Sequence, residues 1–352
     1  MFCYKSILSF NFQISMKNST LSKTLSIALG TIVLSSLFSC TPIKRGEYAS
    51  GSATIFCDDG FRTILEEEID VFEYTYPQSS IIPIFVSQQE AIDTLMADGT
   101  NAIIVTKELT KEQIQYMRSK YKRVVRQQPI AVDAVALITN KDNPVDALSM
   151  EEIQKIMNGQ ITKWSQLAAN DTADIKIVFD NAGSSTVSYL RDKFLPEGKT
   201  ISEVANAFAQ KNNAQVFDIV KQDPDALGVI SVSWLGEDLQ VAKNVPMDQR
   251  MEMYQNENDT IKTNLTTEVK ILKVSNPNED NDFSPVAYSP YQKYIYTGEY
   301  PLVRKVYMIS TASNSTVMHS FYVFVTGFVG QKIISKTGIL PYTNNPRVVQ
   351  VI

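Results

Sequence analysis

Residues 175–194 read IKIVFDNAGSSTVSYLRDKF and carry a strand, a turn of small residues and a helix. The apolar run Ile175–Phe179 predicts a buried strand. After the turn, Val187, Leu190 and Phe194 are three and four residues apart, which places them on one face of a helix. A strand that leads directly into an amphipathic helix is typical of α/β proteins.

The turn between this strand and this helix predicts a binding site. It contains Gly183 and ends in three hydroxyl side chains, Ser184, Ser185 and Thr186. Free backbone N–H groups and the positive end of the helix dipole favour an anion at a helix N-terminus, and ligands of α/β sheets bind at the ends of strands. The alternative is plain N-capping, because Ser and Thr are preferred caps.

The alternation of strand and helix continues along the chain in three series. In the first, strands are expected at 53–57, 81–86, 101–106 and 134–139, and helices at 61–76, 88–97 and 110–121. The second adds a helix opened by the capping box Ser149–Glu152, the strand and helix quoted above, and a strand at 228–233. In the third, strands are expected at 269–274 and 300–309 and one long buried helix at 315–336. Such units imply parallel sheets with helices on both faces.

Length and composition are those of a globular protein. The chain has 352 residues, 44% of them hydrophobic and 20% charged, which is enough for two domains and excludes a disordered or collagen-like chain. The net charge is −5, from 33 basic and 38 acidic residues. Nucleic-acid phosphates are bound by clustered Lys and Arg. We therefore expect no nucleic-acid partner.

The N-terminal segment predicts a lipoprotein signal. Lysines precede the apolar segment Leu25–Phe38, which has signal-peptide length and is too short for a permanent membrane span. The sequence Leu37–Cys40 resembles a bacterial lipobox, in which the cysteine is acylated and becomes the first mature residue. The alternative is an ordinary secretory signal with a chance cysteine. We predict a signal peptide at 1–39, lipidation at Cys40 and a tether at 40–52.

Processing at this site would change the charge and the cysteine content. Residues 1–39 contain three lysines and no acid, so the mature chain would carry a net charge of −8. Besides Cys40 it would retain only Cys57, which excludes an internal disulfide and leaves stability to the core. We expect the protein at the bacterial cell envelope, lipid-anchored and facing the periplasm or the exterior.

Few residues could support catalysis. The only histidine, His319, lies in an apolar helix and is expected to be packed there, since a nucleophile needs a base held beside it. Neither a Walker A sequence nor GxGxxG occurs. Asp58 and Asp59 could serve acid–base chemistry or bind a hard cation, but adjacent loop acids are more often solvated or capping. We predict no enzyme, no cofactor and no metal.

Six segments follow one another in an order that is hard to obtain by chance. They are Asp133–Pro144 (DAVALITNKDNP), Leu148–Trp164 (LSMEEIQKIMNGQITKW), Ser184–Thr186 (SST), Asp225–Trp234 (DALGVISVSW), Tyr300–Tyr307 (YPLVRKVY) and Gly330–Gly338 (GQKIISKTG). Together they resemble the phosphate-binding proteins of phosphate ABC transporters (PstS-like). The resemblance covers residues 53–343.

This resemblance implies an α/β fold, the type II periplasmic binding protein. Two doubly wound lobes are joined by crossing hinge segments and close on a ligand in the cleft between them. One lobe would comprise residues 50–132 and 265–352, and the other residues 133–264. A monomer is expected for this class.

The resemblance also implies hydroxyl and cation positions. The Ser-Gly-Thr loop of the family falls on Ser184–Thr186, which keeps the hydroxyl donors. The arginine that precedes that loop in the family falls near Asp180, a reversal of charge. A third loop falls on Thr106 and Lys107, and Lys107 would supply the missing cation.

The first loop of the family departs furthest. Its hydroxyl residues fall on Cys57, Asp58, Asp59 and Gly60, so two acids replace them. Asp58 would accept the proton of hydrogen phosphate, a role that one carboxylate plays in some relatives. These differences affect the expected ligand more than the expected fold.

Three functions remain open at this point. The first, which we favour, is a lipid-anchored protein that captures inorganic phosphate in the interlobe cleft for the permease of an ABC importer. The second is a lipoprotein of the same fold with another small solute or a sensory task, because Asp58 and Asp59 would repel a dianion. The third is a hydrolase that uses Ser184 or Ser185, for which the sequence shows no base.

Overall fold

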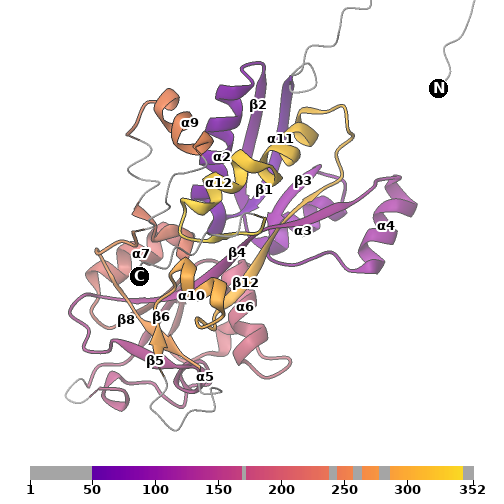
Figure 1. The fold of residues 1–352 in the computed structure, drawn as a ribbon. Coiled ribbons are helices and arrows are strands. Elements are labelled where there is room, and N and C mark those ends of the chain that lie inside the picture. Colours follow the sequence, from indigo (N-terminus) through magenta and orange to yellow (C-terminus); the bar gives the residue numbers. More distant parts are fainter. Residues whose placement is uncertain (1–49, 169–171, 238–243, 257–263, 277–285, 344–352) are drawn as a thin grey trace, which may run out of the picture. The chain divides into compact units, whose positions relative to one another are not determined.

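The computed structural model describes residues 50–168, 172–237, 244–256, 264–276 and 286–343 (Figure 1). They belong to one compact unit, residues 48–352. The predicted signal peptide 1–39, Cys40 and most of the tether 40–52 lie outside the described residues.

The first series of the chain alternates strands and helices as predicted. Its elements are β1 (Gly51–Asp58), a 3-10 helix (Asp59–Phe61), α2 (Arg62–Thr75), β2 (Ser79–Val86), α3 (Gln88–Met96), β3 (Ala102–Val105) and α4 (Lys111–Tyr121). Strand β1 pairs in parallel with β2 along its whole length and with β3 on its other side. The two adjacent acids therefore lie at the carboxyl end of β1, between β2 and β3.

The next strand is longer than predicted and links the halves of the sheet. β4 (Arg126–Thr139) has 14 residues. Its first residues are polar, so the sequence predicted a strand only from residue 134 onward. Its first half pairs with β12 (Val303–Ser310) and its second half with β8 (Ala226–Ser231), both antiparallel. The strand order is β2-β1-β3-β12-β4-β8-β6-β7. The expectation of parallel sheets is therefore wrong at the centre, where β4 is antiparallel to both β12 and β8.

The second series contains the strand and helix quoted first. Its elements are β5 (Ala147–Ser149), α5 (Met150–Met157), β6 (Lys176–Phe179), α6 (Ser185–Phe194), β7 (Ala207–Ala209), α7 (Asn213–Gln222) and β8, with 3-10 helices at Trp164–Gln166, Ile201–Glu203 and Val232–Trp234. β6 pairs in parallel with β7 and β8. The capping box is confirmed, because Ser149 Oγ accepts from Glu152 N at 3.1 Å and Ser149 N donates to Glu152 Oε2 at 2.7 Å.

The third series differs from the prediction at its end. It comprises α9 (Met247–Gln255), β9 (Lys270–Ile271), β10 (Lys273–Ser275), β11 (Ala287–Tyr288), α10 (Gln292–Thr297), β12, α11 (Val317–Thr326), α12 (Phe328–Ser335) and β13 (Leu340–Pro341). The single helix predicted at 315–336 is wrong, since α11 and α12 meet at Gly327 with a bend of 58°. A Cβ on Gly330 would lie 2.6 Å from Phe324 O, so the tight bend requires glycine there.

The described residues hold no single helix that is long and apolar enough to cross a membrane. α11 and α12 meet that criterion only when they are taken together as a bent pair.

Gly228→Ala is expected to destabilise the fold by about 1–3 kcal/mol, the usual cost of overpacking a core. Gly228 lies in β8, and an added Cβ would come within 2.6 Å of Val220 Cγ2 and 2.8 Å of Ile138 Cγ1. Urea unfolding measures the loss. Ala209→Val, at an exposed position of β7, should change stability by no more than about 0.5 kcal/mol. Equal stability of the two variants would contradict this packing.

Candidate functional site

The carboxylate of Asp58 lies at the N-terminus of helix α6. Its Oδ2 accepts a hydrogen bond from Ser185 N at 2.9 Å, and its Oδ1 accepts from Ser185 Oγ at 2.8 Å and Gly60 N at 3.0 Å. Asp58 and Ser185 are both fully buried. The end of β1 is therefore joined to the first residue of a helix 127 positions away.

Asp59 makes the corresponding contacts at the N-terminus of α7. Its Oδ2 accepts from the backbone N of Asn213 at 3.2 Å and from Asn213 Nδ2 at 3.3 Å. Its Oδ1 accepts from Arg62 Nε at 2.9 Å and Nη2 at 2.7 Å. The two adjacent acids thus reach two different helix N-termini, both in the second series of the chain.

Asp180 closes the network from the side of β6. Its Oδ1 accepts from Ser184 Oγ, and its Oδ2 accepts from Asn213 Nδ2 at 3.2 Å. Ser184 Oγ also accepts from Val187 N at 3.1 Å, which makes Ser184 the N-cap of α6. Capping and contact with an anionic group are therefore divided between neighbouring residues. Ser184 caps the helix, and Ser185 donates to the carboxylate of Asp58.

Arg304 is the buried cation of this network. Its Nε and Nη2 each lie 2.9 Å from Asp133 Oδ2, and its Nη2 lies 3.4 Å from Thr186 Oγ1. Asp133 Oδ1 in turn accepts from Ser231 Oγ at 2.8 Å. Arg304 Nη1 is buried and has no hydrogen-bond partner among the described residues. The guanidinium therefore retains an unused donor close to the start of α6.

Burial raises the pKa of three carboxyl groups in this network, those of Asp58, Asp133 and Asp180. For Asp180, burial and then the charge of Asp58 raise the pKa to about 7. Burial also raises the pKa of Asp58, although Arg304 and the hydrogen bonds from Ser185 lower it. The pKa of Asp133 is raised by burial and lowered by Arg304. Burial thus favours the protonated form of these carboxyl groups, and Arg304 opposes it.

A cavity of about 420 Å³ borders the network on the side of Asp59. It is lined by residues at the ends of β1, β2 and β6 and at the starts of α2, α3 and α7: Asp59, Arg62, Phe85, Val86, Ser87, Glu90, Asn181, Lys211 and Asn212. Gly183 lies beside it, and an added Cβ there would come within 3.0 Å of Ser87 Oγ. Since the lining carries both acids and bases, the cavity suits a small charged solute.

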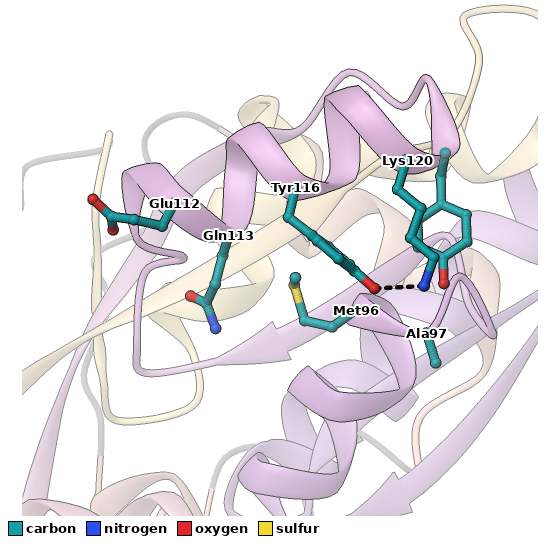
Figure 2. A pocket seen from close by; sticks show the side chains of 7 residues that line it. Met96, Ala97, Glu112, Gln113, Tyr116 and Lys120 are labelled. Atoms are coloured by element: carbon teal, nitrogen blue, oxygen red, sulfur yellow. Dashed lines mark hydrogen bonds between the residues drawn. The ribbon is translucent and has the colours of Figure 1, made fainter.

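A second cavity lies away from this network. It has about 640 Å³ and is a shallow hollow between α3 and α4, lined by Met96, Ala97, Glu112, Gln113, Tyr116, Lys120 and Tyr121 (Figure 2). Lys120 Nζ donates to Tyr116 Oη at 2.5 Å and lies over both tyrosine rings. Its cation is thus already paired within the hollow.

The structure brings together six of the residues that the sequence predicted for the site. These are Asp58, Asp59, Gly60, Ser184, Ser185 and Thr186, with Gly183 beside them. Thr106 and Lys107 follow β3, the parallel neighbour of β1, but their side chains bond to residues outside this network. Thr106 bonds to Gln88 through both its N and its Oγ1, and Lys107 Nζ pairs with Asp192 at 3.0 Å, where both side chains are nearly half exposed.

Sequence reasoning did not identify Arg304 or Asp133. Both lie inside segments quoted for the resemblance, and an Arg and an Asp within apolar strands were the available signal. His319 is on α11, partly buried and stacked on Tyr322. No group of three or more potential metal ligands occurs among the described residues.

The comparisons agree with this architecture. A family model described as "PBP superfamily domain" matches residues 45–329. The phosphate-binding protein PstS of Borreliella burgdorferi is 28% identical over 148 residues, 40% of this chain and 50% of the relative. PstS of Pseudomonas aeruginosa is 21% identical over 202 residues, 54% of this chain and 62% of the relative. The chain thus spans about half to three fifths of the length of these relatives.

Solved structures share the fold at low sequence identity. An ABC-type phosphate transport receptor from Vibrio cholerae has a TM-score of 0.55 and 19% sequence identity. The aligned region covers 82% of this chain and 99% of the receptor chain. A human phosphate binding apolipoprotein has a TM-score of 0.60 and 11% identity, covering 83% of this chain and 91% of its own. At these identities the similarity concerns the fold alone.

Asp180→Asn is expected to flatten the dependence of stability on pH. The Asp180 pKa is raised from 3.8 to about 7, so the folded chain keeps a proton that the unfolded chain has lost, and the free energy of unfolding falls as pH rises through this window. The fall is on the order of a few kcal/mol. Urea unfolding at several pH values measures it. The exposed substitution Asp142→Asn should keep the wild-type slope, and equal slopes in all three chains would contradict the assignment.

Proposed function

Because the chain belongs to the PBP superfamily, we propose that it is an extracytoplasmic solute-binding protein that captures inorganic phosphate for an ABC importer. The observation that carries this proposal is the first turn of α6, where Ser185 N, Ser185 Oγ and Thr186 Oγ1 lie in a buried network with Arg304. Backbone N–H groups, hydroxyls and a guanidinium are the donors that bind oxyanions in proteins.

The proposed mechanism is closure of two lobes on the ligand. The lobes would be residues 50–132 with 265–352, and residues 133–264, so that β4 carries the chain from the first lobe into the second. The bonds of Asp58 to Ser185 and of Asp59 to Asn213 join these two parts. Closure around a desolvated anion would strengthen each bond to it, because water no longer competes.

A specific observation also supports a second candidate, a protein of the same fold that binds another small solute. Asp58 and Asp59 already occupy two helix N-termini with negative charge. The adjoining cavity is lined by Glu90 as well as Arg62 and Lys211. A zwitterionic or cationic solute fits this mixed lining better than a dianion does.

The geometry gives a hydrolase less support. In the part of the chain that the structure describes, the hydroxyls of Ser184 and Ser185 donate to the carboxylates of Asp180 and Asp58. A serine nucleophile is activated by a neighbouring base that is in turn oriented by a third group. His319 is stacked on Tyr322 of its own helix, so we do not propose this activity.

We further propose that Cys40 carries the lipid anchor and that the protein works as a monomer beside its permease. The motivation is the lipobox-like Leu37–Cys40 after an apolar segment of signal length. Several acyl chains on one residue give stable membrane attachment.

Phosphate is expected to raise the melting temperature of the chain from residue 41 onward. A ligand at about 100 times its dissociation constant stabilises the folded state by about 2.7 kcal/mol. A panel of phosphate, arsenate, sulfate and amino acids tests this. A shift with phosphate and arsenate supports the proposal, whereas a shift with amino acids alone would favour the second candidate.

Ser185→Ala combined with Thr186→Ala should weaken phosphate binding at least tenfold, because two hydroxyl donors of the proposed site are lost. Calorimetric titration measures the affinity. The matched control is Ser188→Ala, one turn further along α6 and outside the network. Unchanged affinity in the double variant would place phosphate elsewhere.

Cys40→Ala should release the protein from the membrane fraction and abolish incorporation of labelled palmitate. Cys57→Ala is the control, because Cys57 is buried in β1 and its substitution should leave anchoring intact. Palmitate labelling that persists in Cys40→Ala would contradict the predicted lipidation site.

A further inference from the structure

We infer that Asp58 lowers the anion affinity of this site by acting as an internal substitute for the ligand, so that a captured anion must displace its carboxylate. This inference rests on the proposed function, an anion held at the first turn of α6. It goes beyond that function because it assigns Asp58 the role of competitor, where the sequence suggested an acceptor of the ligand's proton.

The bonds of Asp58 are those that a bound oxyanion would make. Its two carboxylate oxygens accept from Ser185 N at 2.9 Å, Ser185 Oγ at 2.8 Å and Gly60 N at 3.0 Å. The oxygens of a carboxylate and those of a phosphate both accept hydrogen bonds from backbone N–H and hydroxyl donors. While Asp58 holds these donors, an external anion has to compete for them.

The donors of Ser185 are already used by Asp58. The backbone N and the Oγ of Ser185 can each donate one hydrogen bond, and both bonds go to the Asp58 carboxylate. The carboxylate also lies close over Gly60, where an added Cβ would come within 2.9 Å of Asp58 Oδ1. An anion that accepts from both donors of Ser185 must therefore replace the carboxylate oxygens.

An independent observation points to an anion at this position. Arg304 Nη1 is buried without a partner among the described residues, although the same guanidinium bonds to Asp133 and Thr186. A buried charged donor left unpaired is costly. A tetrahedral oxyanion has more acceptor oxygens than the carboxylate of Asp58, so it could use a donor that the carboxylate leaves free.

The charge of the network favours displacement of Asp58 by the anion over binding of the anion beside Asp58. Four carboxylates, those of Asp58, Asp59, Asp133 and Asp180, lie in the network with two guanidiniums, those of Arg62 and Arg304. Adding a dianion beside the Asp58 carboxylate would concentrate further negative charge in a buried region. Exchange of Asp58 for the anion avoids this repulsion and reuses the same donors.

The test is calorimetric titration with inorganic phosphate of the wild-type chain, Asp58→Asn and Asp58→Ser. Loss of the competing charge should raise phosphate affinity at least tenfold in both variants. Asp142→Asn, an exposed change of the same charge, should bind like the wild type. If Asp58 instead accepted the proton of hydrogen phosphate, both Asp58 variants would bind more weakly, which would overturn the inference.

The outcomes distinguish this inference from the proposed function. Binding by the variants but not by the wild type would support the role of Asp58 and refute phosphate as the natural ligand. Binding by all chains with equal affinity would support phosphate and overturn the role of Asp58. No binding by any chain would refute both.

A measurement on the wild-type chain covers the case in which both variants fail to fold. Asp58 is the acceptor for the amides of Gly60 and Ser185. Displacement by phosphate should therefore shift both amide resonances in the same titration. Unshifted resonances up to high phosphate concentration would overturn the inference.

Discussion

Buried carboxylates need hydrogen-bond donors, and this requirement organises the centre of the described structure. Asp58 ends β1, Asp59 follows it, and the two residues are 0% and 5% exposed. An ionised carboxylate in such a place costs several kcal/mol unless donors surround it. The donors come from Ser185 and Asn213, the first residues of α6 and α7. The two acids thereby fix the end of β1 against two helices that the chain forms more than 100 residues later.

The cation of the site comes from the same kind of long-range constraint. Arg304 and Asp133 are direct partners in the antiparallel register of β12 and β4. Their ion pair is therefore a cross-strand pair whose geometry follows from strand register. β4 also pairs with β8 of the second series. Arg304 lies close enough to that series for its Nη2 to contact Thr186 Oγ1 at the start of α6.

Much of this fold was predictable because the deciding signals are local. Apolar spacing predicted α6, and a strand-to-helix turn predicted that Ser184–Thr186 would lie at its start. The cation was not predictable in this way. Lys107 was expected because the resemblance placed a loop of the family on it, whereas Arg304 reaches the site through pairing with Asp133, 171 residues away, which leaves no local pattern. The break at Gly327 was missed because apolar spacing continues across it.

The first turn of α6 also explains how a bound group could be exchanged without loss of the helix. Ser184 Oγ caps Val187 N, while the N and Oγ of Ser185 face Asp58. The cap that stabilises the helix and the donors that hold an anion are thus on different residues. Replacing the carboxylate of Asp58 by an external oxyanion changes the acceptor of Ser185 and Gly60 but leaves the cap on Ser184 in place, so the helix can persist in both states. A site in which one serine performed both tasks would couple ligand release to fraying of the helix, and the chain avoids this by placing two serines in succession.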